Sequence, residues 1–108
     1  GRNDDALAYL AKALTLEPED SEIYMALGRT HVDLMNYAEA AKAYSEAVRL
    51  SPERADAHCN LGIALEGAGN YDDAKRELRE ALRLQPRLQR AQDGLERIRR
   101  VDCSTRYP

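Results

Sequence analysis

Apolar and small side chains recur three and four residues apart along most of the chain, the spacing that keeps them on one side of an α-helix. The stripes are Tyr24, Leu27, Gly28 and His31 in one segment, and His58, Leu61, Gly62 and Leu65 in another. Turn residues interrupt the pattern near Met35 and again over 67–70. The pattern predicts helices over 21–34, 37–50, 71–84 and 88–101, with one more helix ending near Gly67.

The predicted helices form pairs that repeat along the chain with a period of about 34 residues. Pro18, Pro52 and Pro86 are evenly spaced at this interval, and alanines and leucines recur with them. Because proline cannot continue a helix, each proline closes one pair before the next begins. The repeat therefore predicts stacked helical hairpins, in which we expect Asn36 and Asn70 to cap the second helix of each pair.

The repeated positions resemble the tetratricopeptide repeat, whose pattern is W-x2-L-G-x2-Y, then A-x3-F, then P. The matching positions are Tyr24-x2-Leu27-Gly28-x2-His31, Ala40-x3-Tyr44 and Pro52, then His58-x2-Leu61-Gly62-x2-Leu65, Ala74-x3-Leu78 and Pro86. The resemblance implies an all-α fold, a right-handed α-α superhelix of antiparallel helix pairs. We expect one domain over 1–101, made of a half repeat (1–20), full repeats (21–54 and 55–88) and a capping helix (89–101), followed by a tail (102–108).

The resemblance also implies a concave groove, lined by the first helix of each pair, that receives peptides or helices. Met25, Val32, Cys59 and Ile63 are apolar where a solvated helix face should be polar, so we expect a partner or neighbouring helices to cover them. Charged neighbours would set the register of a ligand more than its affinity. The predicted partner-binding residues are Glu22, Met25, Arg29, Val32, Asp33, Asp56, Cys59, Ile63, Glu66, Arg90, Asp93, Arg97 and Arg100.

One subclass of the family clamps the C-terminal carboxylate of heat-shock chaperones with Lys, Asn and Arg side chains. Asn60 and Arg90 stand at clamp positions in this chain. Met25, Arg29 and Gly94 stand where the clamp needs Lys, Asn and Arg. We therefore do not expect this chain to be a clamp of that kind.

The first predicted helix lacks a hairpin partner, because Gly1 falls at the turn between the two helices of its repeat. Leu7, Leu10 and Leu14 would form its apolar face. We expect this face to be covered either by upstream chain or by a second copy, which makes the three leucines candidates for self-association in a homo-oligomer.

Composition narrows the function classes. The chain has 16 basic and 19 acidic residues, a net charge of −3, so we expect no nucleic-acid partner. No apolar run is long enough to predict a membrane span. Cys59 and Cys103 show no ligand spacing, and we expect a reduced, cytoplasmic setting.

No arrangement of residues in the sequence predicts catalysis, a metal site or a cofactor. His58 and Cys59 are neighbours, so a helix directs their side chains about 100° apart, and they cannot form a dyad. We therefore expect a non-catalytic adaptor or scaffold that binds a protein or peptide. The alternatives are a self-assembling scaffold, or the repeat portion of a larger enzyme or chaperone.

Overall fold

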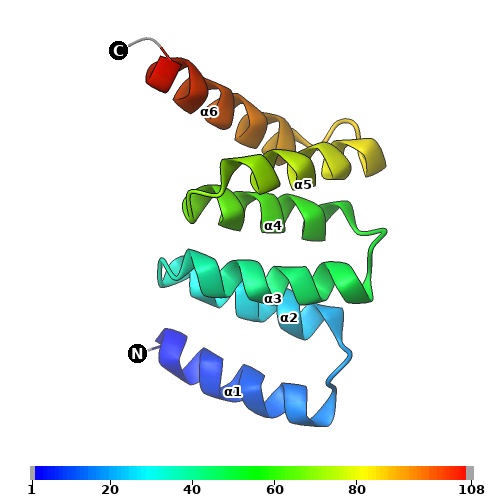
Figure 1. The fold of residues 1–108 in the computed structure, drawn as a ribbon. Coiled ribbons are helices and arrows are strands. Elements are labelled where there is room, and N and C mark those ends of the chain that lie inside the picture. The colour runs from blue at the N-terminus through cyan, green and yellow to red at the C-terminus, as the bar shows by residue number, and fades with distance from the viewer. Residues whose placement is uncertain (1, 107–108) are drawn as a thin grey trace.

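Six α-helices follow one another in a computed structural model that describes residues 2–106, with side chains described for residues 2–101 (Figure 1). They are α1 (Arg2–Leu16), α2 (Ser21–Asp33), α3 (Tyr37–Leu50), α4 (Ala55–Gly67), α5 (Tyr71–Leu84) and α6 (Gln89–Arg106). The predicted all-α fold of antiparallel helix pairs is confirmed. The predicted end of the last helix is wrong, because α6 continues past residue 101 to Arg106. Cys103 has no described side chain, and residues 107 and 108 of the predicted tail lie outside the described residues.

The helices stack in chain order from α1 at one end to α6 at the other (Figure 1). Helix α2 packs against α3 and α4 packs against α5, while α3 also contacts α4 and joins the two hairpins. Helix α6 contacts both α5 and α4, and α1 contacts α2. The stack measures 49 × 30 × 18 Å, so it is longer than it is wide or deep.

A glycine allows close approach of the two helices in each hairpin. A Cβ added to Gly28 would lie 2.5 Å from the Tyr44 ring, and one added to Gly62 would lie 2.6 Å from Cγ of Leu78. Both distances are far below van der Waals contact, so the partner side chain fills the space that the glycine leaves. The Leu-Gly pairs of the sequence repeat therefore mark a close contact between the two helices of each hairpin.

The core consists of two clusters of buried side chains. One joins α2, α3 and α4 around Tyr44 and Leu61, and the other joins α4, α5 and α6 around Leu78 and Ile98. Alanines at 40, 47, 74 and 81 are fully buried, which lets the helices lie close together. Helix α1 contributes no buried residue to either cluster.

Both hairpin turns close in the same way. The N–H groups of Asn36 and Asn70 donate to carbonyl oxygens five residues earlier, at 2.8 and 2.9 Å, as in a Schellman motif. The residue before each asparagine has a positive φ, 61° at Met35 and 83° at Gly69. The predicted side-chain caps are wrong, because neither asparagine side chain bonds to the following helix backbone. The amide of Asn70 donates instead to the Asp73 carboxylate at 2.8 Å.

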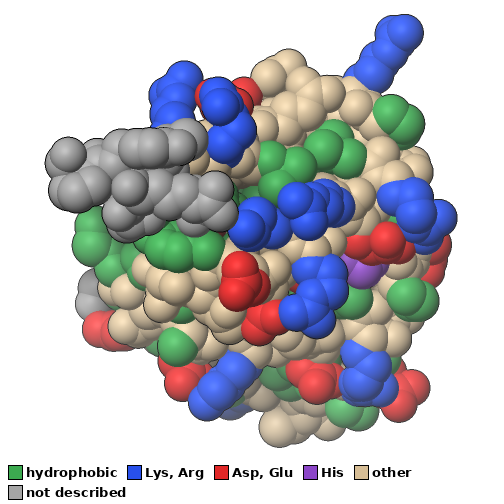
Figure 2. Space-filling view, turned by 45° about the horizontal axis from the view of Figure 1, so that its top comes forward, with side chains coloured by type: hydrophobic (Ala, Val, Ile, Leu, Met, Phe, Trp, Pro, Cys, Tyr) green, Lys and Arg blue, Asp and Glu red, His purple; other side chains and the backbone are tan. Residues whose placement is uncertain are grey.

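Helix α6 ends the stack with a polar surface. Glu96 stands one repeat length after Gly62, where the hairpins have glycine, and it pairs with Arg99 and Arg100. Figure 2, in which the α6 end faces the viewer, shows basic and acidic side chains interspersed over this surface. A polar outer side is what the end of a repeat stack requires in water. Among the described residues, no helix is long and apolar enough to cross a membrane.

Candidate functional site

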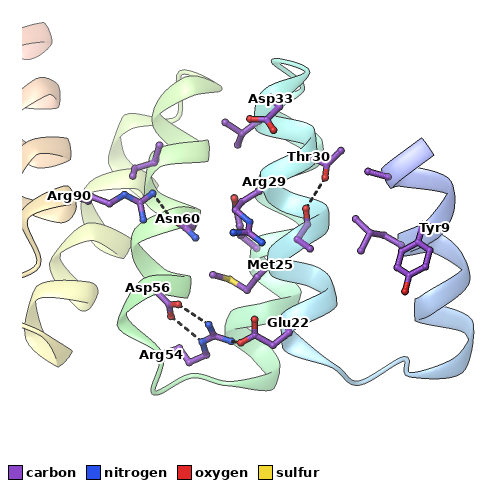
Figure 3. A pocket seen from close by; sticks show the side chains of 16 residues that line it. Tyr9, Glu22, Met25, Arg29, Thr30, Asp33, Arg54, Asp56, Asn60 and Arg90 are labelled. Atoms are coloured by element: carbon purple, nitrogen blue, oxygen red, sulfur yellow. Dashed lines mark hydrogen bonds and ion pairs between the residues drawn. The ribbon is translucent and has the colours of Figure 1, made fainter. Parts of the chain in front are cut away.

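A groove of about 790 Å³ runs along the face formed by the first helices of the hairpins. Helices α2 and α4 form its walls, α1 borders one side and the start of α6 borders the other (Figure 3). Its lining residues are Ala6, Tyr9, Leu10, Glu22, Met25, Ala26, Arg29, Thr30, Val32, Asp33, Tyr44, Arg54, Asp56, Asn60, Ile63 and Arg90. The groove is therefore mixed in chemistry, with apolar side chains between charged ones.

Three charged side chains form a network at one end of the groove. Arg54 precedes α4 and donates to both carboxylate oxygens of Asp56, at 3.0 and 2.7 Å, and also to Glu22 of α2 (Figure 3). The hydrogen bonds from Arg54 lower the pKa of Asp56 against the opposing effect of burial. This network ties the start of α4 to the start of α2, so its three charges are already satisfied within the protein.

Two further arginines face the middle of the groove. Arg90 of α6 donates from Nη2 to Oδ1 of Asn60 at 2.7 Å, and Arg29 projects from α2 (Figure 3). Asn60 is almost fully buried, so its amide holds the Arg90 guanidinium in place. Within residues 2–101, Arg29 forms no ion pair, and the hydrogen-bond partner of Arg90 is neutral.

The hydroxyl of Tyr44 lies within the electrostatic influence of the same two arginines. Burial raises the pKa of Tyr44, the positive charges of Arg29 and Arg90 oppose that rise, and Asp33 adds to it. All three charged residues line the groove together with Tyr44.

Apolar side chains form much of the remaining lining. Met25 is 6% exposed and packs in the core, whereas Val32 and Ile63 are half-buried and keep part of their surface toward the groove. Tyr9 is 73% exposed on the α1 side. The groove can therefore bury apolar side chains of a ligand between its charged positions.

Eight of the predicted partner-binding residues line this groove. They are Glu22, Met25, Arg29, Val32, Asp33, Asp56, Ile63 and Arg90. Of these, Met25 is largely covered by neighbouring helices, and Asp56 and Glu22 are held by Arg54.

The assignment of Cys59 to the groove is wrong. Its side chain is fully buried in the cluster that α4 forms with α5 and α6, beside Ala91 and Ile98. Helix α6 crosses α4 on this side and covers the thiol. Burial raises the pKa of Cys59, and the charges of Arg90 and Arg97 oppose that rise.

Four other predicted residues do not line the groove, because their side chains are engaged along α6. Arg97 forms two hydrogen bonds of 2.8 Å with Glu66, which fixes α6 to α4. Asp93 accepts a hydrogen bond from Gln89 at 2.8 Å, and Arg100 lies 3.5 Å from Glu96. Only the contact between Arg97 and Glu66 joins α6 to another helix, since the other two are internal to α6, and none of these four residues lines the groove.

Several lining residues were not predicted from the sequence. Tyr44 reaches the groove from α3 through the space beside Gly28, and Arg54 reaches it from the turn before α4. Ala26 and Asn60 stand one repeat length apart and line the floor at equivalent positions. The repeat in the sequence already relates these two positions, so it could have been used to predict that both line the groove.

The three leucines predicted for self-association, Leu7, Leu10 and Leu14, are half-buried on α1. Leu10 also borders the groove, whereas Leu7 and Leu14 do not. On the same helix Leu16 is 81% exposed. Helix α1 therefore keeps apolar side chains in partial contact with solvent and contributes none that is fully buried.

His58 is held by two acceptors in the protein interior. Its Nδ1 lies 2.8 Å from a carboxylate oxygen of Glu77, and its Nε2 lies 2.8 Å from the carbonyl oxygen of Pro52. The imidazole thus joins the turn before α4 to α5. Its two nitrogens are both used in these contacts, away from the groove lining.

A family model described as tetratricopeptide repeat matches residues 1–55, 25–87 and 59–95 of this chain. Searched against curated proteins, the sequence finds no significant match.

Solved structures of the same architecture superpose closely. The first tetratricopeptide domain of Spaghetti (RPAP3), bound to the HSP90 peptide SRMEEVD, gives a TM-score of 0.90 at 21% identity over 95% of this chain and 82% of that one. MamA gives 0.88 at 24% identity over 94% of this chain, which spans 60% of the MamA chain. The Thermobaculum terrenum O-GlcNAc transferase gives 0.79 at 33% identity over 90% of this chain and 19% of that enzyme.

Proposed function

The chain belongs to the tetratricopeptide repeat family, and from this premise we propose that it is a non-catalytic module that binds a peptide or protein segment in its concave groove. Its role is that of an adaptor or scaffold. The partner contributes a stretch of chain long enough to contact α2 and α4 together.

The observation that carries this proposal is the composition of the groove lining. Exposed parts of Val32 and Ile63 offer apolar surface, while Arg29, Asp33 and Arg90 offer charges that the protein leaves without an opposite partner within the described side chains. Apolar surface beside a few fixed polar groups is typical of sites that bind ligands. A purely structural helix face would instead be polar and internally paired.

The reactive side chains support a non-catalytic role. Cys59 is buried and its pKa is raised, which disfavours the thiolate that a nucleophile requires. His58 is occupied by Glu77 and Pro52. Neither residue lines the groove, so the two most reactive side chains of α4 are remote from a bound ligand.

The first tetratricopeptide domain of Spaghetti (RPAP3), which shares this fold, is bound to the HSP90 peptide SRMEEVD, and this supports peptide binding as the function to test. This chain has Met25 and Gly94 where a clamp for a terminal carboxylate needs Lys and Arg. We therefore propose peptide binding here without that clamp.

The proposal can be tested by selecting a phage-displayed library of random nonapeptides on the purified chain. The groove variant is Ala26→Gln with Ile63→Gln, because both side chains line the groove and neither is fully buried. The control variant is Ala11→Gln with Val101→Gln. It also replaces one alanine and one β-branched aliphatic residue by glutamine, but at exposed positions outside the groove. Circular dichroism establishes that both variants remain folded.

We expect peptides to be enriched on the wild-type chain and on the control variant, and to be lost on the groove variant. Enrichment that survives in the groove variant would place binding on another surface. No enrichment on the wild-type chain would contradict peptide binding in this groove.

A second candidate function, self-assembly, is favoured by α1. This helix contributes no buried residue, and Tyr9 and Leu16 are 73% and 81% exposed. A second copy that covers this surface would remove apolar area from water. The other end of the stack is polar, so assembly would start from α1.

Sedimentation velocity over a wide range of concentrations tests this second candidate. It predicts concentration-dependent oligomers that Tyr9→Ser with Leu16→Ser weakens. A wild-type chain that stays monomeric at several hundred micromolar would rule self-assembly out.

A further inference from the structure

The charges of the groove are divided unevenly along its length. At one end Arg54 is shared between Glu22 and Asp56, which leaves that end slightly acidic and internally satisfied. In the rest of the groove the lining charges are Arg29, Arg90 and Asp33, which sum to one positive charge. The middle of the groove therefore favours an anionic group on the ligand.

Arg90 is prepared for such a group before any ligand arrives. One of its Nη2 hydrogens is used by Asn60, and a guanidinium has five N–H donors, so most of them remain for a ligand. Asn60 is buried and comes from α4, so the guanidinium is held at the groove by a side chain that itself moves little. A fixed arginine loses less conformational freedom on binding than a free one.

Arg29 faces the same region from α2, on the other wall of the groove (Figure 3). Both arginines line the groove together with Tyr44, and their positive charges oppose the rise in its pKa. Two guanidinium groups with unused donors repel each other, and a carboxylate placed between them relieves that repulsion.

Building on the proposed function, we propose that the groove selects a peptide segment with an internal Asp or Glu side chain, whose carboxylate is bound between Arg29 and Arg90. Flanking apolar side chains of the segment pack on Val32 and Ile63. The recognised group is a side chain within the segment, so the ligand needs no free C-terminus. Asp33 stands one helical turn after Arg29 on α2 and repels a second acid beside this site, which limits the preference to one acidic position (Figure 3).

The same phage library tests this inference, because the displayed nonapeptides are joined to the coat protein at their C-terminal ends and offer no free carboxylate there. Selection is run in parallel on the wild-type chain, on Arg29→Gln with Arg90→Gln, and on Arg87→Gln. Arg87 is an exposed arginine just before α6 that does not line the groove, so it is the matched control for loss of charge. The most enriched peptide is then synthesised with an acetylated N-terminus and an amidated C-terminus, both as selected and with its acidic residue changed to the corresponding amide.

We expect Asp or Glu to be enriched at one position on the wild-type chain and on Arg87→Gln, and not on the double variant. Fluorescence anisotropy should show a loss of roughly tenfold or more in affinity when the acid is changed to the amide, as for a hydrogen-bonded charge. On the double variant the two peptides should bind equally.

Two results would overturn the inference. One is enrichment of peptides that have no preferred acidic position. The same result follows if the double variant keeps the acidic preference of the wild-type chain, because either outcome would show that Arg29 and Arg90 do not select an acidic side chain. Absence of any enrichment on the wild-type chain would remove the inference together with groove binding itself.

Discussion

Replacement of Met35 by glycine should stabilise the protein. Met35 follows α2 with φ of 61°, in the left-handed region that residues other than glycine adopt at a cost. The equivalent residue of the next hairpin is Gly69, with φ of 83° and the same pattern of turn hydrogen bonds. The side chain of Met35 is 76% exposed, so its removal uncovers little of the core.

The size of the effect follows from two opposing terms. Relief of the left-handed conformation gains about 1–2 kcal/mol. The greater freedom of glycine in the unfolded chain takes back about 0.4–1 kcal/mol. With the midpoints of these two ranges, Met35→Gly should raise the free energy of unfolding by about 0.8 kcal/mol, which corresponds to a rise of about 3–6 °C in Tm for a domain of this size.

Urea unfolding followed by circular dichroism measures the effect. The control is Met35→Ala, which removes most of the side chain but keeps the backbone restriction, and should change stability little. The reverse change, Gly69→Ala, should lower stability by a similar amount, since an added Cβ there meets no atom within 4 Å and acts through φ alone. If Met35→Gly proves no more stable than Met35→Ala, the reasoning from backbone conformation is refuted.

Three further predictions concern packing, thiol reactivity and pH. Gly28→Ala should destabilise the chain by about 1–3 kcal/mol in urea unfolding, because the new Cβ would overlap the Tyr44 ring, and a loss below about 0.5 kcal/mol would contradict the tight contact. Cys59 should react with iodoacetamide far more slowly in the native chain than in urea, because it is buried and its pKa is raised. The reaction is measured in the Cys103→Ser variant, so that Cys59 is the thiol that reacts. Equal rates in the two conditions would contradict the burial of Cys59. Asp56 has a lowered pKa in the folded chain. Its hydrogen bonds with Arg54 therefore stabilise the fold above the ordinary Asp pKa, which is about 4, and this stabilisation is lost as the pH falls through the lower pKa of the folded state. The stability difference between the wild-type chain and Asp56→Asn should therefore shrink between pH 6 and pH 3, and a difference that grows on acidification would contradict that sign.

The hairpins could be predicted from the sequence because the same physical requirement returns once in each repeat. Gly28 and Gly62 each make room for one large side chain of the second helix, so the same spacing in the sequence predicts both the pairing of the helices and a close contact between them. Helix ends were predicted to within a few residues by Pro52 and Pro86. The end of α6 was predicted too early. Residues 102–106 contain no proline or glycine, so the sequence has no residue there that marks where the helix ends.

The groove was predicted less completely, because periodicity gives a helix face but not the path of the next helix across it. Met25 and Cys59 are equivalent positions, and both are buried by the neighbouring first helix, α4 and α6 respectively. The groove is also lined one residue further along each helix, at Ala26 and Asn60, which the prediction left out. A helix turns by about 100° per residue, so this small rotation of the predicted stripe decides which side chains a ligand can reach.

Chemical-shift mapping of the amidated nonapeptide selected from the library, titrated into the ¹⁵N-labelled chain, tests groove binding most directly. We expect the largest shifts in backbone amides of α2 and α4 and near Arg90, with saturable behaviour. Shifts concentrated on the outward faces of α3 and α5, with those of α2 and α4 unchanged, would contradict the assignment of the groove as the binding surface.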